Sequence, residues 1–357
     1  MRENGMNICL KKKRYKSLYE TDADKILTYH LGGLYELDTK DNSTIKIGDF
    51  PLSVMNKLFV KFRLMERLFR LDVRVSIALN NNIILVSYKG KVYNVDLTAK
   101  TIHEEHTYRQ EMNSPLAFNK IENIDGFEDC IVYGEYFGNP DRKEVAIYRR
   151  LLDEKSEWEK VYEFSRNAIR HIHAIISDKY RNQVLILTGD DDSESVVWIT
   201  KDNFKSIKPI LIGSQQYRSC CAFPTEEGLL FATDTPFEQN YIGMIKQDQS
   251  GAWGAERLFD INGTVMYATT CGGNYIFNTV VEAGAGVRTN YSELILVNSL
   301  GEYKLICKFK KDIFPLKLFQ YGCVQFCNSK SNNFLYLYPV AVKKFDSVLL
   351  KIEFETN

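Results

Sequence analysis

Short apolar runs separated by polar turns recur along the chain, and four consecutive segments repeat them in one order. Each segment begins with a short apolar strand and a polar turn. A second apolar strand then ends at Gly, Asp, Glu or Thr, and a variable loop, a third strand and an outer strand follow. The segments are 116–164, 169–213, 217–260 and 264–309. Short apolar runs bounded by turn residues are typical of β-strands, so the pattern predicts consecutive four-stranded antiparallel sheets.

The rest of the chain extends the same pattern. Two shorter units lie over 25–50 and 73–108, and three clear strands lie within 316–355. The N-terminal stretch 6–12 supplies the outer strand that the last unit lacks, and this pairing would close a ring and remove exposed sheet edges. We therefore predict an all-β fold, a seven-bladed β-propeller of four-stranded antiparallel blades closed by an N-terminal strand. Propellers of this length form one domain, so we expect a single domain over residues 1–357.

One segment, residues 55–71, breaks the pattern because its apolar residues alternate irregularly with Lys and Arg. It fits either an amphipathic helix on the side of the propeller or a long basic strand. Two roles stay open for this insert. It is either a segment packed on the surface or a helix that docks on a membrane surface or a protein partner.

Charge excludes some partners. The 46 basic residues balance the 46 acidic ones, so no overall field favours nucleic acid, and we expect none to bind. The 21 Tyr and 21 Phe against 3 Trp suit half-buried strands and support the β assignment.

Location is predicted from what the chain contains. It has no apolar run long enough for a transmembrane segment, and the N-terminal residues do not resemble a secretory signal. Most of the eight cysteines lie singly inside apolar strand patterns, which favours buried free thiols in a reducing compartment over a disulfide framework. We therefore expect a cytoplasmic protein.

An acid recurs at the predicted turn between third and fourth strands. A Trp lies five residues after Asp153 and after Asp248, and Asp202 occupies the corresponding place in the blade between them. An Asp in such a turn can accept hydrogen bonds from the turn backbone, while the Trp packs between strands. We interpret these acids as structural.

With these turns the chain resembles the Asp-box, or BNR-repeat, propellers over residues 114–310. In this sialidase-like family the box reads Ser-x-Asp-x-Gly-x-x-Trp. Leu151 and Lys155 replace its Ser and Gly in the first copy, and Lys246 and Ser250 replace them in the last. The chain is also similar to unsecreted propellers of this type encoded among bacterial surface-polysaccharide genes. The family mixes glycosidases, lyases and binding proteins, so the resemblance implies a fold and a link to carbohydrate rather than one reaction.

Candidate site residues occupy equivalent places in several blades. In a propeller, the first strand of each blade and the loop after the second strand surround the central channel, where ligands bind. The residues that we predict as catalytic are His171, His173, Glu135, Tyr136, Asp190 and Glu282. The residues that we predict to bind substrate are Arg142, Arg170, Arg218, Asp191, Asp234 and Asn240.

The His pair is the most specific of these signals. Alternation along a strand places His171 and His173 on one face. Such a pair can take part in catalysis or ligand binding, form a structural hydrogen bond in the core, or share a metal ion. The other His residues lie far away in the chain and no local group completes a metal shell, so we expect no metal and no cofactor.

The arginines indicate the charge of the ligand. Arg142, Arg170 and Arg218 suit recognition of a carboxylate or phosphate. The resemblance to sialidases implies an arginine triad with a Tyr–Glu pair and an Asp acid, but the Arg-Ile-Pro motif of true sialidases is missing, and these residues do not match family positions one by one. The acids permit glycoside hydrolysis, and the His, Tyr and Arg set permits β-elimination from a uronic acid.

These residues predict a carbohydrate-active propeller protein, glycosidase- or lyase-like, that acts on an acidic glycan or glycosyl ligand at its channel face. Two alternatives stay open. One is a non-catalytic scaffold or glycan-binding protein of surface-polysaccharide biosynthesis, with a protein partner. The other is a glycosyltransferase that uses a sugar-nucleotide donor.

Overall fold

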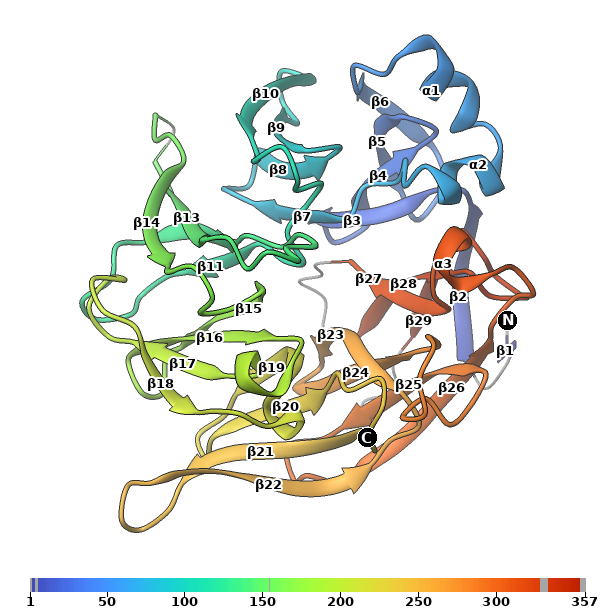
Figure 1. Ribbon diagram of the computed structural model, residues 1–357. Helices are drawn as coiled ribbons and strands as arrows, with labels where there is room; N and C mark the ends of the chain where they lie inside the picture. The colour runs from blue at the N-terminus through green and yellow to red at the C-terminus, as the bar shows by residue number, and fades with distance from the viewer. Residues whose placement is uncertain (1, 4–5, 154, 328–332, 354–357) are drawn as a thin grey trace. The chain divides into compact units, whose positions relative to one another are not determined.

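The chain is an all-β protein, a seven-bladed β-propeller made of antiparallel sheets (Figure 1). The computed structural model describes residues 2–3, 6–153, 155–327 and 333–353. The chain consists of two compact units, one of residues 1–86, 93–103 and 267–357 and one of residues 87–92 and 104–266. The predicted fold class is confirmed.

The first unit contains three of the sheets. One consists of β3 (Lys16–Asp22), β4 (Lys25–His30), β5 (Gly33–Asp38) and β6 (Thr44–Asp49). Another consists of β23 (Thr264–Cys271), which begins in the second unit, β24 (Asn274–Val280), β25 (Tyr291–Val297) and β26 (Tyr303–Lys310). The last contains β27 (Cys323–Phe326), β28 (Phe334–Val340) and β29 (Val348–Glu353), joined by β2 (Met6–Lys13) and the short β1 (Arg2–Glu3).

The second unit contains the three sheets that carry the site. One consists of β11 (Asn119–Ile121), β12 (Cys130–Gly134), β13 (Val145–Leu151) and β14 (Glu159–Phe164). The next consists of β15 (His171–Asp178), β16 (Gln183–Gly189), β17 (Val197–Thr200) and β18 (Lys208–Leu211). The third consists of β19 (Ser219–Pro224), β20 (Leu229–Thr233), β21 (Tyr241–Gln247) and β22 (Trp253–Asp260). Short 3-10 turns, η1 (Asp192–Glu194) and η2 (Gln215–Tyr217), precede β17 and β19.

The remaining sheet is shared between the units. It consists of β7 (Val75–Ala78), β8 (Ile83–Tyr88), β9 (Lys91–Asp96) and β10 (Thr101–Thr107).

The N-terminal strand closes the last sheet as predicted. β2 pairs antiparallel with β29, and the register runs from Asn7 opposite Glu353 to Lys13 opposite Val348. Buried and exposed residues alternate along β2, which places Ile8 in the same core cluster as residues of β29. Burying one such side chain contributes about 1.5–3 kcal/mol, and the pairing gives the β29 edge a partner.

The recurrent acids lie in the turns between third and fourth strands, where the sequence places them. Asp153, Asp202 and Asp248 each accept hydrogen bonds from backbone N–H groups two or four residues further on, at 2.8–3.0 Å. Trp158 packs on neighbouring aromatic rings, and Trp253 packs against a core cluster of buried residues. These contacts agree with a structural role for the motif.

Residues 55–71 form two short helices, α1 (Val54–Phe59) and α2 (Arg63–Leu68), and not a long strand. A third short helix, α3 (Leu316–Phe319), belongs to the same unit. Ser53 caps α1 by accepting a hydrogen bond from the N–H of Asn56 at 3.2 Å. Among the described residues, no helix is long and apolar enough to cross a membrane.

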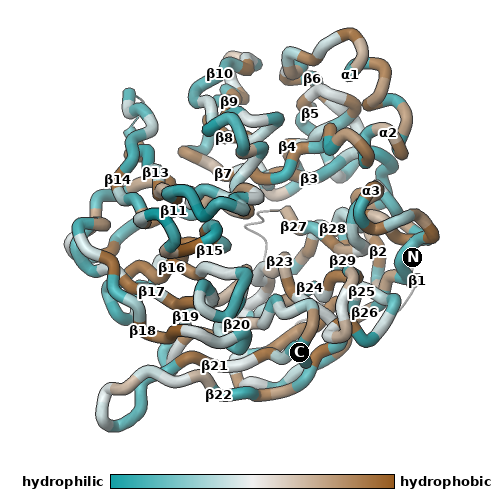
Figure 2. The backbone as a smooth tube through the Cα atoms, viewed as in Figure 1, coloured by the Kyte–Doolittle hydropathy of each residue, from teal (hydrophilic) through white to brown (hydrophobic). Residues whose placement is uncertain are grey.

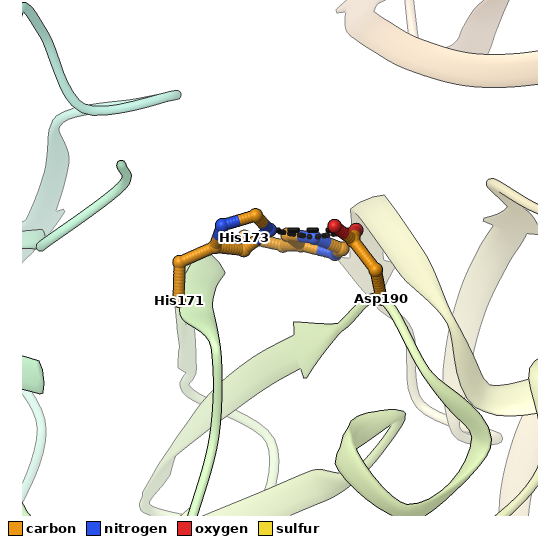
Figure 3. Close-up of side chains that lie close together, drawn as sticks. All are labelled: His171, His173 and Asp190. Carbon is orange, nitrogen blue, oxygen red and sulfur yellow. Dashed lines mark hydrogen bonds and ion pairs between the residues drawn. The ribbon is translucent and has the colours of Figure 1, made fainter. Parts of the chain in front are cut away.

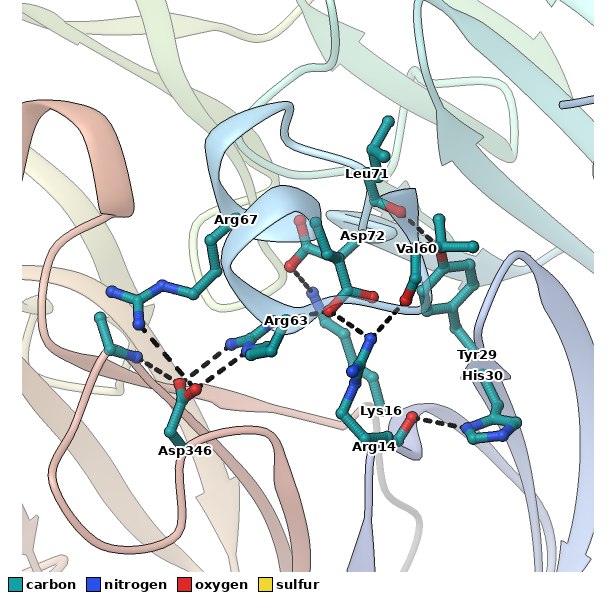
Figure 4. A network of polar contacts seen from close by, with 12 residues as sticks. Arg14, Lys16, Tyr29, His30, Val60, Arg63, Arg67, Leu71, Asp72 and Asp346 are labelled. Atoms are coloured by element: carbon teal, nitrogen blue, oxygen red, sulfur yellow. Dashed lines mark hydrogen bonds and ion pairs between the residues drawn. The ribbon is translucent and has the colours of Figure 1, made fainter. Parts of the chain in front are cut away.

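The charged side chains of α2 face inward, contrary to the pattern of a simple amphipathic helix. Arg63 Nε lies 2.9 Å from an oxygen of Asp346, and Arg63 also pairs with Glu66 of its own helix (Figure 4). Arg67 is 1% exposed and pairs with Asp312 at 2.6 Å. These ion pairs tie the helices to distant parts of the chain, so the basic side chains of α2 are structural.

Several apolar residues of the insert are exposed, whereas Val60 and Leu71 are buried. Figure 2 shows hydrophobic positions along α1. The large side chains exposed on this segment are Val54, Met55, Leu58, Phe62 and Phe69.

Candidate functional site

The predicted His pair lies at the start of β15, next to the end of β16. The β15–β16 register shifts between Ile172 and Ala174, so His173 is the extra residue of a β-bulge. A bulge re-aims side chains that strict alternation would fix. Both His rings are buried, and the Nε2 atoms of His171 and His173 lie 3.1 Å apart.

Asp190, the residue that follows β16, completes a triangle of donor atoms (Figure 3). Its Oδ1 lies 3.4 Å from Nε2 of His171 and 3.4 Å from Nε2 of His173. Three groups with lone pairs therefore point at one place.

The other ring nitrogens fix the tautomers. Nδ1 of His171 lies 3.0 Å from the carbonyl oxygen of Phe137, and Nδ1 of His173 lies 3.1 Å from that of Ser219. A carbonyl oxygen only accepts hydrogen bonds, so each Nδ1 carries a proton and donates it. In a neutral ring, Nε2 then carries a lone pair and no proton. Two such nitrogens and a carboxylate are favourable together only if a cation, either a proton or a metal ion, lies between them.

Two arginines hold the carboxylate in place. Nη1 of Arg170 lies 3.1 Å from Oδ2 of Asp190, and Nη2 of Arg218 lies 3.0 Å from Oδ1. Arg218 also donates to the backbone carbonyl of Asp190 at 3.0 Å. Charge-assisted hydrogen bonds of this kind are strong, so the Asp190 side chain has little freedom.

The electrostatics keep Asp190 ionised and His173 neutral. Burial by itself raises the pKa of Asp190, but the adjoining rings of His171 and His173 and the charge of Arg218 hold that pKa well below its usual range. Burial lowers the pKa of His173 to about 4, against the opposing charge of Asp190. His173 therefore offers a free Nε2 lone pair at neutral pH.

Gly189 makes the close packing of this cluster feasible. A Cβ at this position would lie 2.6 Å from Cε1 of His173 and 3.3 Å from Cγ of Arg218. The first of these separations is shorter than side chains tolerate, so a larger residue would displace the ring.

Tyr136 is the aromatic neighbour of the pair. Its ring centroid lies 4.3 Å from that of His171 and 6.2 Å from that of His173. The structure thus brings together half of the predicted site. The gathered residues are Tyr136, Arg170, His171, His173, Asp190 and Arg218.

Three other predicted residues make ion pairs of their own. Glu135 lies 2.9 Å from Nη1 of Arg109 and accepts a backbone N–H bond from β13, while burial raises its pKa. Arg142 pairs with Asp191 at 2.6 Å and also with Glu194. These two ion pairs stabilise the loop after β16. Their contacts are those of structural braces, although their roles in a reaction stay predictions.

Three more of the predicted residues lie outside the triangle of His171, His173 and Asp190. They are Asp234, Asn240 and Glu282. Asp234 accepts a hydrogen bond from the Cys220 thiol at 3.3 Å. It also lies 3.5 Å from Nε of Arg218, so Arg218 connects it to the cluster. Asn240 hydrogen-bonds both backbone groups of Thr235 and stabilises the loop after β20. Glu282 belongs to the other compact unit.

Some contributors were missed from the sequence. Gln215 donates to the Asp190 carbonyl at 2.9 Å, and Gly189 leaves room for the ring of His173. Cys220 is the bulged residue of β19, as His173 is of β15, and with His173 and Asp234 it forms a second group of donor atoms within 4.8 Å of one another. Cys220 lies near the start of the first strand of its blade, as His173 does, and this equivalent place in the sequence was the available signal.

Comparison with known proteins supports the fold. No family model and no curated protein matches the chain. The solved CNH domain of AfRom2 is 7% identical with a TM-score of 0.58, and the match covers 100% of this chain and 98% of that one. A chain in the crystal structure of the mitotic checkpoint complex is 11% identical with a TM-score of 0.56, over 99% of this chain and 94% of that one. At such identities the likeness shows the fold alone.

Proposed function

We propose that this propeller is a carbohydrate-active protein that cleaves an acidic glycan by β-elimination. The observation that carries the proposal is the gathering of Arg170, Arg218, Tyr136 and the His pair around Asp190. This cluster lies where β15 and β19 begin and β16 ends, on loops and strand ends held by a rigid scaffold.

The charge of the cluster favours an anionic ligand. Arg170 and Arg218 balance the negative charges of Asp190 and of Asp234 beyond Arg218, and the cation that the His pair requires leaves the cluster net positive. Arg170 is the more accessible arginine, since 32% of its side chain is exposed against 14% for Arg218. A carboxylate on a sugar ring satisfies this excess of positive charge.

The acids of the cluster do not suit hydrolysis. Glycoside hydrolysis in the common mechanisms needs two carboxyl groups on either side of the bond, one of them protonated. Asp190 is ionised and occupied by two arginines, and Glu135 is paired with Arg109. Elimination needs instead a positive centre that stabilises charge on the substrate carboxylate, and a base.

In the proposed step the base takes the proton from the ring carbon beside the carboxylate. The electron pair forms a carbon–carbon double bond. The bond from the next ring carbon to the leaving sugar oxygen breaks as that oxygen takes up the proton that the base now carries. Tyr136 is the base, because its phenol lies beside the cationic centre and the His nitrogens are engaged with their cation.

Product analysis tests this reaction. Uronate-containing polysaccharides incubated with the protein should give ultraviolet absorbance from the new double bond in step with new reducing ends. Tyr136→Phe should lower kcat at least about 100-fold, the usual contribution of general base catalysis, while substrate binding persists. Tyr180→Phe, at an exposed tyrosine, is the matched control.

Each of the other possible results of this experiment would indicate a different function. Reducing ends without absorbance would mean hydrolysis, and binding without either would mean a glycan-binding protein or scaffold. Transfer from a sugar nucleotide would support the glycosyltransferase. Any of these results would overturn the elimination.

We also propose that the chain belongs to the Asp-box propellers and that the protein is cytoplasmic. Membership of the Asp-box propellers is supported by the turn acids of three blades, and a cytoplasmic location by eight cysteines that are all free thiols.

A further inference from the structure

The three converging donor atoms have the dimensions of a metal site. Nε2 of His171, Nε2 of His173 and Oδ1 of Asp190 are separated by 3.1, 3.4 and 3.4 Å. The centre of such a triangle lies about 1.9 Å from each corner, so an ion slightly out of the plane has the about 2.0–2.2 Å ligand distances of Zn²⁺.

The outer contacts are also those of a metal site. Metal-bound His residues typically donate their other ring nitrogen to a carbonyl or carboxylate, and ligating carboxylates are hydrogen-bonded in turn. Here His171 and His173 donate Nδ1 to the carbonyls of Phe137 and Ser219, and Asp190 is held by its arginines. These contacts orient the ligand atoms before any ion binds.

We propose that His171, His173 and Asp190 bind a divalent first-row transition-metal ion, with Zn²⁺ as the reference ion. Two imidazoles and one carboxylate leave further coordination positions for water or a ligand oxygen. The site extends the proposed function but does not depend on it, since binding of the ion is measured without any substrate.

Nearby charges are compatible with the ion. Arg170 and Arg218 both contact Asp190, and Asp234 lies beyond Arg218. Arg218 uses one lone-pair direction of Oδ1 and a carboxylate oxygen offers another, so both contacts can form. The added charge makes the cluster more cationic, which suits an anionic ligand at the open positions.

The neighbouring group of His173, Cys220 and Asp234 is a poorer site. His173 and Asp234 are buried, and the Cys220 thiol donates its proton to Asp234. Burial and the Asp234 charge raise the pKa of Cys220 well above its usual value, which opposes the thiolate that a metal needs.

Metal binding by the full-length chain tests the site. After treatment with a chelator and its removal, the protein should bind one Zn²⁺ per chain in calorimetry and elemental analysis, and Co²⁺ should give visible absorption bands. His171→Ala, His173→Ala and Asp190→Asn should each weaken Zn²⁺ binding by more than the about 10–100-fold that outer-contact changes cost. His103→Ala, at an exposed His outside the cluster, should bind as the wild type does.

Two results would overturn the proposed metal site. A folded wild-type chain that binds no Zn²⁺ or Co²⁺ would overturn the proposal and leave a shared proton between the rings. Binding that survives His171→Ala but is lost in Cys220→Ser would assign the ion to the other group and overturn the present one. Circular dichroism of each variant separates loss of a ligand from loss of folding, and the near-isosteric Asp190→Asn supplies a variant with little change of shape. If Zn²⁺ binds but no glycan is cleaved, the metal site stands and the proposed reaction fails.

Discussion

Nε2 of His171 lies 3.1 Å from Nε2 of His173, although each ring already donates its Nδ1 proton to a backbone carbonyl. The usual His–His hydrogen bond needs a donor on one side, and neutral rings in these tautomers provide none. The pair is therefore built around a cation, and the predictions below concern the groups that build it and the fold that holds it.

Gly189→Ala should displace the ring of His173 in the cluster of His171, His173 and Asp190. The new methyl group would overlap the ring of His173, so we expect about 1–3 kcal/mol lower unfolding free energy and weaker Zn²⁺ binding. Denaturant unfolding and calorimetry measure the two effects. Gly254→Ala is the control, because nothing lies within 4 Å of its Cβ, and it should match the wild type. Wild-type metal affinity in Gly189→Ala would show that the ring position does not matter.

Arg67→Ala should destabilise the protein strongly. The change breaks the buried ion pair with Asp312, which keeps only Lys311, and removes the hydrogen bond from Arg67 Nε to the carbonyl of Phe319. Breaking a buried pair costs about 3–5 kcal/mol in comparable sites. Lys160→Ala removes half of an exposed pair with Glu163 and should change stability little. Equal unfolding midpoints in urea for the two variants would contradict the structural role of the insert.

Ile8→Ala should show how much the closing strand contributes. Ile8 belongs to a buried cluster shared with β29, so we expect a loss of about 2–5 kcal/mol in unfolding free energy. Cys9→Ala, at the exposed neighbouring position of the same strand, is the control. A loss no larger than that of the control would mean that β2 is not part of the cooperative fold.

His106 should make the fold sensitive to mild acid. Its Nε2 lies 2.8 Å from the hydroxyl of Tyr133, and burial lowers the pKa of His106. A His whose folded pKa is below the unfolded value of about 6.5 stabilises the fold above that pH, and this contribution is lost as pH falls toward the folded pKa. His106→Gln should therefore lose less Tm than the wild type between pH 7 and pH 5. His103→Gln should follow the wild type, and parallel curves for all three proteins would refute the assignment.

The architecture was predictable because it follows from repetition. Apolar runs of regular spacing gave the blades, and the incomplete last unit identified the strand at Ile8 as its closing strand. The turn acid Asp248 was predictable for the same reason, since its contacts are local.

The site was predictable only in part. His171 and His173 stood out as a pair, but the bulge that turns His173 and the approach of Asp190 depend on pairing between strands. The expectation of no metal rested on the absence of a nearby third ligand in sequence, and Asp190, the third ligand of the proposed site, comes close to the pair only in the fold. The inward-facing Arg67 was not predictable either, because its partner Asp312 lies far away in the chain.

The protonation state of the His171 and His173 ring nitrogens shows whether the pair binds a metal ion. Nitrogen chemical shifts of ¹⁵N-labelled histidine distinguish protonated, free and metal-bound ring atoms, and spectra of the His171→Ala and His173→Ala variants assign the signals. We expect that in Zn²⁺-loaded protein both rings keep a protonated Nδ1 and show a metal-bound Nε2. A proton on Nε2 of either ring in the presence of Zn²⁺, or an unprotonated Nδ1, would contradict it.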